Sequence, residues 1–302
     1  RFAGLFQFLQ NFLLVRRFLQ RKGHVRTADR GHRYAERHAI NLALEVRGRR
    51  PDGYNEIRSL IQTIELADTL SFEEGERLLV NYEPPWEPEG DLVLRSAAKL
   101  WEVAGEGRGA VIRVQKRVPV AFGLGGGSSD AAATLLGLNR LWSLGMSREE
   151  LLPLASEIGS DVAFFLYGGT ALVEGRGEKV MSLPSIKTHW LVLLCPSLPI
   201  MESKTAHLYQ RLTASLFTSG KRSERLARQL RDGAELTSTS LFNVFESVVW
   251  EAFPGLERYK QHLLEAGAET VHLAGSGPAL FSWEAEAGTA ARIQSFLQAR
   301  GL

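Results

Sequence analysis

The sequence has few residues that could form covalent or metal cross-links. Cys195 is the single cysteine among 302 residues, which excludes an internal disulfide framework and a cysteine metal cluster. It lies in the apolar run WLVLLCP and fits a reducing compartment, so we expect a cytoplasmic protein. The 7 histidines are scattered, with no His-x-x-x-His spacing, and they give a zinc site little support.

Excess charge and long apolar runs are also lacking. The formal net charge of +2 gives no reason to expect nucleic acid as the main partner. A helix that crosses a bilayer needs about 20 apolar residues, and the apolar run near the N-terminus is too short and too interrupted for that. We therefore expect neither nucleic-acid binding nor a membrane span.

Residues 1–37 differ from the rest of the chain because acidic residues are scarce there. Aromatic and apolar residues recur at helical spacing from Phe2 to Leu13, and several arginines follow. Two interpretations stay open. One is an amphipathic helix that lies on a membrane surface or acts as a targeting segment. The other is a non-native or disordered extension translated from upstream of the true start, since the chain opens on Arg1.

The rest of the chain is rich enough in apolar residues to build a core. Hydrophobic residues make up 44% of the sequence, and its length predicts one large or two packed domains. Strands and helices alternate from His38 onward and the pattern restarts near residues 183–187, which predicts an α+β half at 38–184 and another at 185–302. Residues 59–74 are predicted as one or two strands with a turn near Asp68, and FFLYGGTALVEG as a strand.

The most informative stretch is PVAFGLGGGSSDAAATLLGLNRLW, residues 119–142. Four glycines in five positions exceed what a tight turn with capping serines needs, and they let backbone N–H groups approach a ligand closely. The helix that follows adds unpaired N–H groups and the positive end of its dipole. Strand, glycines and helix together predict a cradle for phosphates. Asp130, just inside this helix, would have to point away from a triphosphate or lie beside Mg²⁺.

Two common phosphate motifs are excluded at this loop. No Gly-Lys-Ser/Thr follows, so it is not a Walker A loop, and the glycine spacing does not fit the dinucleotide fingerprint. The stretch PVAFGLGGGSSDAAA instead resembles the central motif of the GHMP kinases. INLALEVRGRRPDGYNEI, IGSDVAFFLYGGTALVEGRGE and LAGSGPALF agree in order and spacing, so the resemblance runs from about His38 to the C-terminus.

The resemblance implies a two-domain α+β GHMP-kinase-like fold. Its N-terminal part would be a ribosomal-protein-S5-like nucleotide-binding domain and its C-terminal part a ferredoxin-like α/β domain. It further implies that ATP and Mg²⁺ are used to phosphorylate a hydroxyl of the methylerythritol part of a cytidine-diphosphate substrate, in the non-mevalonate isoprenoid route. A homodimer is one assembly open to such a chain.

The resemblance also assigns roles to individual residues. Asp161 would be the catalytic carboxylate, although an Asp there is by itself more often a cap or turn residue. Ser129 would also hold Mg²⁺, and Tyr54 would stack on the cytosine, with Tyr209 on its other face. The phosphates of ATP would be held by Pro119, Val120, Ala121, Phe122, Gly123, Leu124, Gly125, Gly126, Gly127, Ser128 and Ser129. The substrate would be contacted by Asn41, Tyr54, Asn55, Tyr209, Gly275, Ser276 and Gly277.

The chain departs from the family pattern at several positions. Ala39 stands where the family has the lysine that partners the catalytic aspartate, and Asn55 stands where it has a histidine that reads cytosine. Val244 and Ala163 replace an aspartate and a proline. Residues two apart on a strand share a face, so Arg37 should point to the same side as Ala39 and His38 to the other. We therefore expect Arg37 to replace the lost ammonium in part, unless it is simply a solvated residue before the strand.

Three functions remain open at this point. The first is an active kinase of the cytidyl substrate. The second is a kinase of another small alcohol, such as homoserine or mevalonate, which RPDGY disfavours because an aromatic residue after the turn suits a base. The third is a nucleotide-binding relative with impaired catalysis, which the substitutions at positions 39 and 55 favour.

Overall fold

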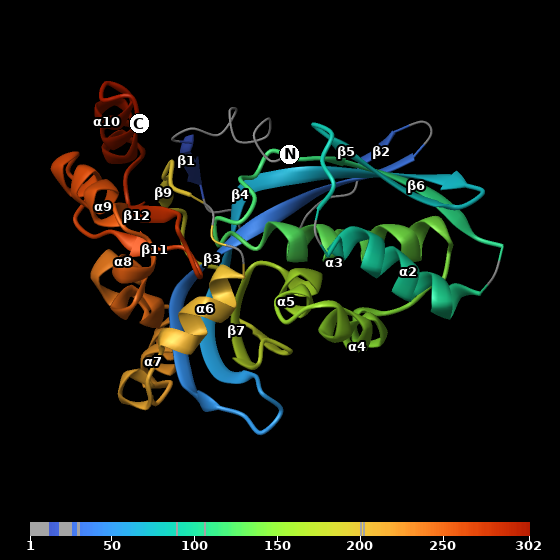
Figure 1. The fold of residues 1–302 in the computed structure, drawn as a ribbon, viewed down its shortest axis with the longest axis horizontal. Helices are drawn as coiled ribbons and strands as arrows, with labels where there is room; N and C mark the ends of the chain where they lie inside the picture. Colours follow the sequence, from blue (N-terminus) through green and yellow to red (C-terminus); the bar gives the residue numbers. More distant parts are fainter. Residues whose placement is uncertain are drawn as a thin grey trace.

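We describe a computed structural model of the chain that covers residues 12–17, 26–28, 31–88, 90–105, 107–199, 201 and 203–302. For strand residues 12–17, 26–28, 31–33 and 35–37 only the backbone is described. Two sheets with helices around them lie side by side, as Figure 1 shows. The fold is α+β, as the sequence predicts. None of the helices in the described ranges is long and apolar enough to cross a membrane.

The larger sheet has its strands in the order β10-β3-β4-β6-β5, with β2 paired to β3, β7 paired to β4 and β8 to β7. Pairs β5–β6 and β10–β3 are parallel, and the others are antiparallel. The strands of this sheet are β2 (Arg26–Ala28), β3 (Gly31–Arg49), β4 (Asn55–Gly75), β5 (Leu78–Glu83), β6 (Gly109–Gln115), β7 (Thr170–Gly175), β8 (Lys179–Ser182) and β10 (Phe242–Asn243).

Helices gather on one side of this sheet in Figure 1. They are α2 (Leu92–Ala104), α3 (Gly126–Leu141), α4 (Arg148–Ile158) and α5 (Val162–Tyr167). Helix α4 begins with a capping box in which Ser147 and Glu150 satisfy each other's backbone N–H groups. Buried alanines and leucines of α3 pack with Leu70 and Phe72 of β4, which holds α3 firmly against the sheet.

The second sheet is antiparallel and runs in the order β1-β9-β12-β11. Its strands are β1 (Phe12–Arg17), β9 (Trp190–Cys195), β11 (His272–Leu273) and β12 (Leu280–Glu284). The α-helices of this half are α6 (Lys204–Arg211), α7 (Lys221–Arg231), α8 (Val249–Ala252), α9 (Leu256–Glu265) and α10 (Ala287–Gln298). Short 3₁₀ helices are η1 (Ala214–Leu216), η2 (Ser238–Ser240) and η3 (Val244–Ser247).

The two halves form one continuous structure. Strand β10 comes from the second half but pairs in parallel with β3, with Phe242 opposite Ala43 and Asn243 opposite Leu44. One core cluster contains Ile40 and Leu60 of the first sheet together with Leu193 and other residues of the second half. Because this apolar contact is shared, the cleft between the halves has rigid walls.

Several local predictions are wrong. Asp68 is not at a turn, because β4 runs through it without a break. Val162–Tyr167 is a helix rather than a strand, and strand β7 begins only at Thr170. Residues 12 and 13, expected on an amphipathic helix, lie in β1, while positions 1–11 fall outside the described residues. The predicted boundary at 184/185 falls between β8 and β9.

Candidate active site

The glycine loop connects β6 to α3. Gly125 is the N-cap of α3 in the left-handed conformation, with φ +70°, and no side chain caps the helix there. The N–H groups of the first turn are therefore open to a ligand, at the positive end of the helix dipole. A Cβ on Gly123 would overlap the carbonyl oxygen of Ala274, so this glycine lets the second half approach closely.

A cleft of about 390 Å³ lies over this loop. It is lined by the loop from Pro119 to Ser128 and by Asp161, Lys204, Thr205 and Tyr209. Asn41, Gly275, Ser276, Tyr82, Trp86 and Pro88 also line it. The loop that carries Gly275 is held by Asn243, whose Nδ2 donates to the carbonyls of Leu273 at 3.0 Å and Gly275 at 2.7 Å. The cleft is thus built from both halves.

A second pocket of about 460 Å³ adjoins the first. Its distinctive lining residues are Tyr54, Asn55, Arg49 and Arg176, with the Arg176 guanidinium 4.9 Å from the centre of the Tyr54 ring. The two pockets share the residues Ile57, Asp161, Thr205 and Tyr209. A group bound in either pocket can therefore reach the carboxylate of Asp161.

Asp161 precedes α5 as its N-cap residue but makes no capping hydrogen bond. The side chain is exposed to the cleft, yet the protein that surrounds the cleft desolvates it and raises the pKa of the carboxyl. Burial, and secondarily the charge of Asp161, raises the pKa of the Tyr209 hydroxyl. Tyr209 packs edge-to-face on Phe245, with the two ring centres 4.9 Å apart, and this contact fixes the orientation of the Tyr209 ring.

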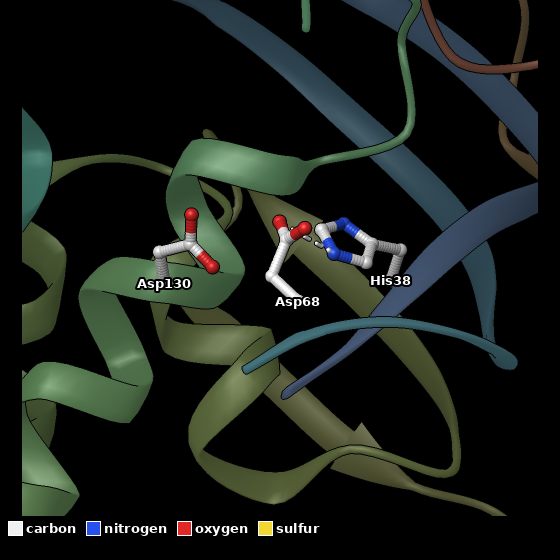
Figure 2. A group of neighbouring side chains, drawn as sticks. All are labelled: His38, Asp68 and Asp130. Carbon is white, nitrogen blue, oxygen red and sulfur yellow. Dashed lines mark ion pairs between the residues drawn. The ribbon is translucent and has the colours of Figure 1, made fainter. Parts of the chain in front are cut away.

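A buried ionic cluster lies beneath the start of α3. His38 from β3, Asp68 from β4 and Asp130 from α3 converge there, as Figure 2 shows. His38 Nε2 lies 3.2 Å from Asp68 Oδ2, and Lys116 Nζ lies 2.5 Å from Asp68 Oδ2 and 2.8 Å from Asp130 Oδ2. Asp68 and Asp130, two of these three potential metal ligands, bind the ammonium of Lys116, which repels a metal ion from that position.

The cluster also fixes the entry to the glycine loop. Asp68 Oδ1 accepts hydrogen bonds from the N–H groups of Arg117 at 2.6 Å and Val118 at 3.0 Å. Burial alone would raise the pKa of Asp68, but His38, Lys116 and the N–H of Arg117 hold it well below its usual range. Burial raises the pKa of Asp130 to about 6 in spite of Lys116. The two carboxyls thus differ in proton affinity because Asp68 has more donors.

His38 does not point where strand alternation predicts. The pairing of β3 with β4 shifts register between Arg37, which is opposite Ala67, and Ala39, which is opposite Thr63. The shift is a bulge that breaks the strict alternation of sides, so His38 is buried and faces Asp68. Ala39 is buried in the core of the first half and does not line the cleft. The side chain of Arg37 lies outside the described part of the chain.

Most of the other predicted residues line one pocket or both. Pro119 to Ser128, Asn41, Gly275 and Ser276 line the first, Tyr54 and Asn55 the second, and Tyr209 and Asp161 both. Ser129, the expected Mg²⁺ ligand, is fully buried and lines neither pocket, so Ser128 is the serine at the cleft. Gly277 is also buried, and its carbonyl accepts a hydrogen bond from Lys204.

Sequence reasoning missed several residues at this site. They are Asp68 and Lys116 in the cluster, Lys204, Thr205 and Trp86 in the cleft, and Arg49 and Arg176 in the second pocket. Three of them had a detectable signal: Lys116 lies three residues before Pro119, where the glycine motif starts, and Arg49 and Arg176 lie inside two of the segments that carry the family resemblance. Asp68, Lys204, Thr205 and Trp86 come to the site through tertiary contacts.

Comparison with known proteins identifies the family. The model of the GHMP kinases N terminal domain matches residues 91–169. A 4-diphosphocytidyl-2-C-methyl-D-erythritol kinase from Dehalococcoides mccartyi is 44% identical over 263 residues, which are 87% of this chain and 92% of that protein. One from Symbiobacterium thermophilum is 43% identical over 80% of this chain and 86% of that protein.

Solved structures match as well. A crystal structure of 4-(cytidine 5'-diphospho)-2C-methyl-D-erythritol kinase superposes with a TM-score of 0.72 and 32% identity, over 88% of this chain and 95% of that one. The homoserine kinase of Cytophaga hutchinsonii gives a TM-score of 0.70 at 19% identity, over 92% of this chain and 93% of that one, a likeness of fold alone.

Proposed function

Since this chain belongs to the GHMP kinases, among the 4-diphosphocytidyl-2-C-methyl-D-erythritol kinases, we propose that it transfers the terminal phosphoryl group of ATP to a hydroxyl of the methylerythritol part of that substrate. This is a step of the non-mevalonate route to isoprenoid precursors. The observation that carries the proposal is that Asp161 lines both pockets. A donor in one and an acceptor in the other would meet at this carboxylate.

The first pocket suits ATP. The open N–H groups at the start of α3 and the glycine loop would bind the phosphates. Tyr82 and Trp86, whose rings are 5.4 Å apart, offer an apolar surface for the adenine. Mg²⁺ prefers oxygen ligands, and the Ser128 hydroxyl, which lines the cleft, would hold it together with phosphate oxygens. When bound, the ion would neutralise phosphate charge.

The second pocket suits the cytidine-diphosphate part of the acceptor. Tyr54 and Tyr209 present aromatic rings for the cytosine, and Arg49 and Arg176 supply positive charge for the diphosphate. Asn55 can donate and accept hydrogen bonds at a pyrimidine edge. Asn41, whose Nδ2 is held by Ser59 Oγ at 2.8 Å, lies with Gly275 and Ser276 on the side toward ATP and would contact the alcohol end.

Asp161 would accept the proton of the attacking hydroxyl. The raised pKa of its carboxyl makes the carboxylate a stronger base than a fully solvated aspartate. Phosphoryl transfer otherwise needs alignment and charge compensation more than covalent chemistry. The alternative of impaired catalysis is not favoured, because a kinase of this substrate is 44% identical to this chain over 87% of its length. A partial role for Arg37 stays a prediction, and unchanged turnover of Arg37→Ala would refute it.

The direct test is turnover of 4-diphosphocytidyl-2-C-methyl-D-erythritol with ATP. Asp161→Asn keeps the size of the side chain but cannot take the proton, so kcat should fall by about 10²–10⁴ while ATP still binds. Asp232→Asn, an exposed residue that ends α7, is the control and should leave kcat unchanged. Full activity of Asp161→Asn would contradict the assignment.

Location and assembly complete the proposal. The lone Cys195, which is buried, supports the cytoplasm, where thiols stay reduced. A homodimer stays a prediction, and light scattering of the purified protein tests it by measuring the molar mass in solution.

A further inference from the structure

Lys204 is an unusual residue in the wall of the cleft. It is the first residue of α6, and only 9% of its surface is exposed. Its Nζ donates a hydrogen bond to the carbonyl oxygen of Gly277. Burying an ammonium costs free energy unless a charge of opposite sign compensates it.

No such charge is supplied within the described part of the chain, where no carboxylate lies within ion-pair distance, 4.0 Å, of Lys204 Nζ. Lys116, the other buried lysine at this site, lies within 2.8 Å of two carboxylates. The desolvation of Lys204 accordingly lowers its pKa to about 7, whereas the pKa of Lys116 is raised by Asp130 and Asp68 although burial opposes this. Lys204 therefore has a carbonyl dipole but no counterion.

The surroundings of Lys204 indicate where a counterion would come from. Gly277, its hydrogen-bond partner, packs on the glycine loop, with its nitrogen 2.8 Å from the position that a Cβ on Gly123 would occupy. Lys204 and Asp161 line the same cleft as this loop. An anion held by the loop and directed toward Asp161 thus comes next to the buried ammonium.

We propose that Lys204 binds the terminal phosphate of ATP and stabilises the charge on the phosphoryl group during transfer. This inference rests on the proposed function. In the step, the bond from the γ-phosphorus to the bridging oxygen breaks and the bond to the substrate oxygen forms. The hydroxyl proton goes to Asp161, ADP leaves with the electron pair, and Lys204 keeps its proton. Gly277 holds the ammonium in place before ATP arrives.

Lys204→Met tests the proposal, with Lys221→Met as the matched control, since Lys221 is the first residue of α7 but exposed. Calorimetry with Mg²⁺ and either ATP or ADP, without the alcohol substrate, measures each affinity. In Lys204→Met the affinity for ATP should fall by about tenfold or more, and that for ADP by less than about twofold. Lys204→Arg should recover part of the loss.

Proton uptake gives a readout that a merely structural lysine would not move. At pH 8 about nine-tenths of a group with pKa near 7 is unprotonated, and a bound phosphate would restore its proton. Wild-type protein should therefore take up close to one proton with ATP, and Lys204→Met should not. The other titratable groups that line this cleft are Asp161, Tyr209, Lys116, Asp130, Asp91 and Tyr82, and all of them are retained in the variant.

The possible results separate the two proposals. Equal ATP and ADP losses, or none, in Lys204→Met would overturn the role of Lys204, and so would unchanged proton uptake. A wild-type protein that binds ATP but does not phosphorylate the cytidyl substrate would overturn the proposed function alone. If Lys204→Met fails to fold, Lys204→Gln carries the same measurements. With the role correct, kcat also falls, on the order of 10².

Discussion

Replacing Asp130 with asparagine should flatten the pH dependence of stability in a defined window. Asp130 is 2% exposed and shares Lys116 with Asp68, so burial raises its pKa from the usual 3.8 to about 6. The folded protein therefore holds this proton more tightly than the unfolded chain does. The stabilisation that this proton gives is present below pH 3.8 and is lost as the pH rises through 6.

The size of the effect follows from the same two values. One pKa unit corresponds to about 1.4 kcal/mol, so the step from 3.8 to about 6 makes about 3 kcal/mol of stability depend on pH. Asparagine has nearly the same shape but no titrating group. Asp68, whose pKa is lowered, acts in the opposite direction and only below its ordinary pKa, so the two windows do not overlap.

Urea unfolding of wild-type and Asp130→Asn protein between pH 4 and pH 7 measures this directly. The stability difference should shift by about 2–2.5 kcal/mol in favour of the variant across that range, and the rest of the effect lies below pH 4. A constant offset reflects the changed hydrogen bonding to Lys116 and does not bear on the argument, since only the slope reports the proton. Asp232→Asn should give a curve parallel to that of wild type. Parallel curves for Asp130→Asn would refute the reasoning.

Two further predictions concern the loop and the acceptor pocket. Gly123→Ala should lose about 1–3 kcal/mol of stability and most activity, because φ is +83° and a Cβ would overlap the Ala274 carbonyl. Gly145→Ala is the control for backbone strain alone, since Gly145 is also at positive φ but has open space around it. Equal activity of the two variants would contradict the steric argument. Tyr54→Ala should raise KM for the cytidyl substrate by the factor that corresponds to about 1–3 kcal/mol of lost stacking, and it should leave KM for ATP unchanged. Steady-state kinetics in which KM for ATP rises instead would contradict the placement of the cytosine at Tyr54.

The sequence carries the architecture well where patterns are local. The succession of a strand, a glycine loop and a helix is predicted and present, although α3 begins at Gly126, two residues before the predicted start near Ser128. The segment VAFFLY was mispredicted because a short apolar run fits a buried strand and a buried helix equally. The environment of Lys204 is invisible to pattern reading, since its partner Gly277 lies 73 residues away in the chain.

The side on which His38 lies was mispredicted from strand alternation, and the physical reason is also local. A single register shift between Arg37 and Ala39 changes which residues face the helices. The consequence is that His38, rather than a residue at position 39, reaches the space beneath the loop. A Cβ on Gly126 would lie 3.2 Å from His38 Cε1 and 3.6 Å from Lys116 Nζ, so the histidine and the lysine together support the first turn of α3.

The four loop positions differ in the physical reason why each carries glycine. A Cβ on Gly123 would overlap the second half of the protein, one on Gly125 would lie 2.8 Å from the ring of Phe165, and Gly126 lies against His38. At Gly127 the nearest atom would be 3.5 Å away, an ordinary contact, and the residue is exposed. Packing therefore disfavours a side chain at Gly123 and Gly125, and at Gly126 the ring of His38 would have to shift by a few tenths of an ångström, whereas packing does not explain the glycine at position 127. The glycines of the predicted cradle are mainly those that attach the loop to the rest of the protein, and in the proposed function the phosphates would bind to the rigid backbone that results.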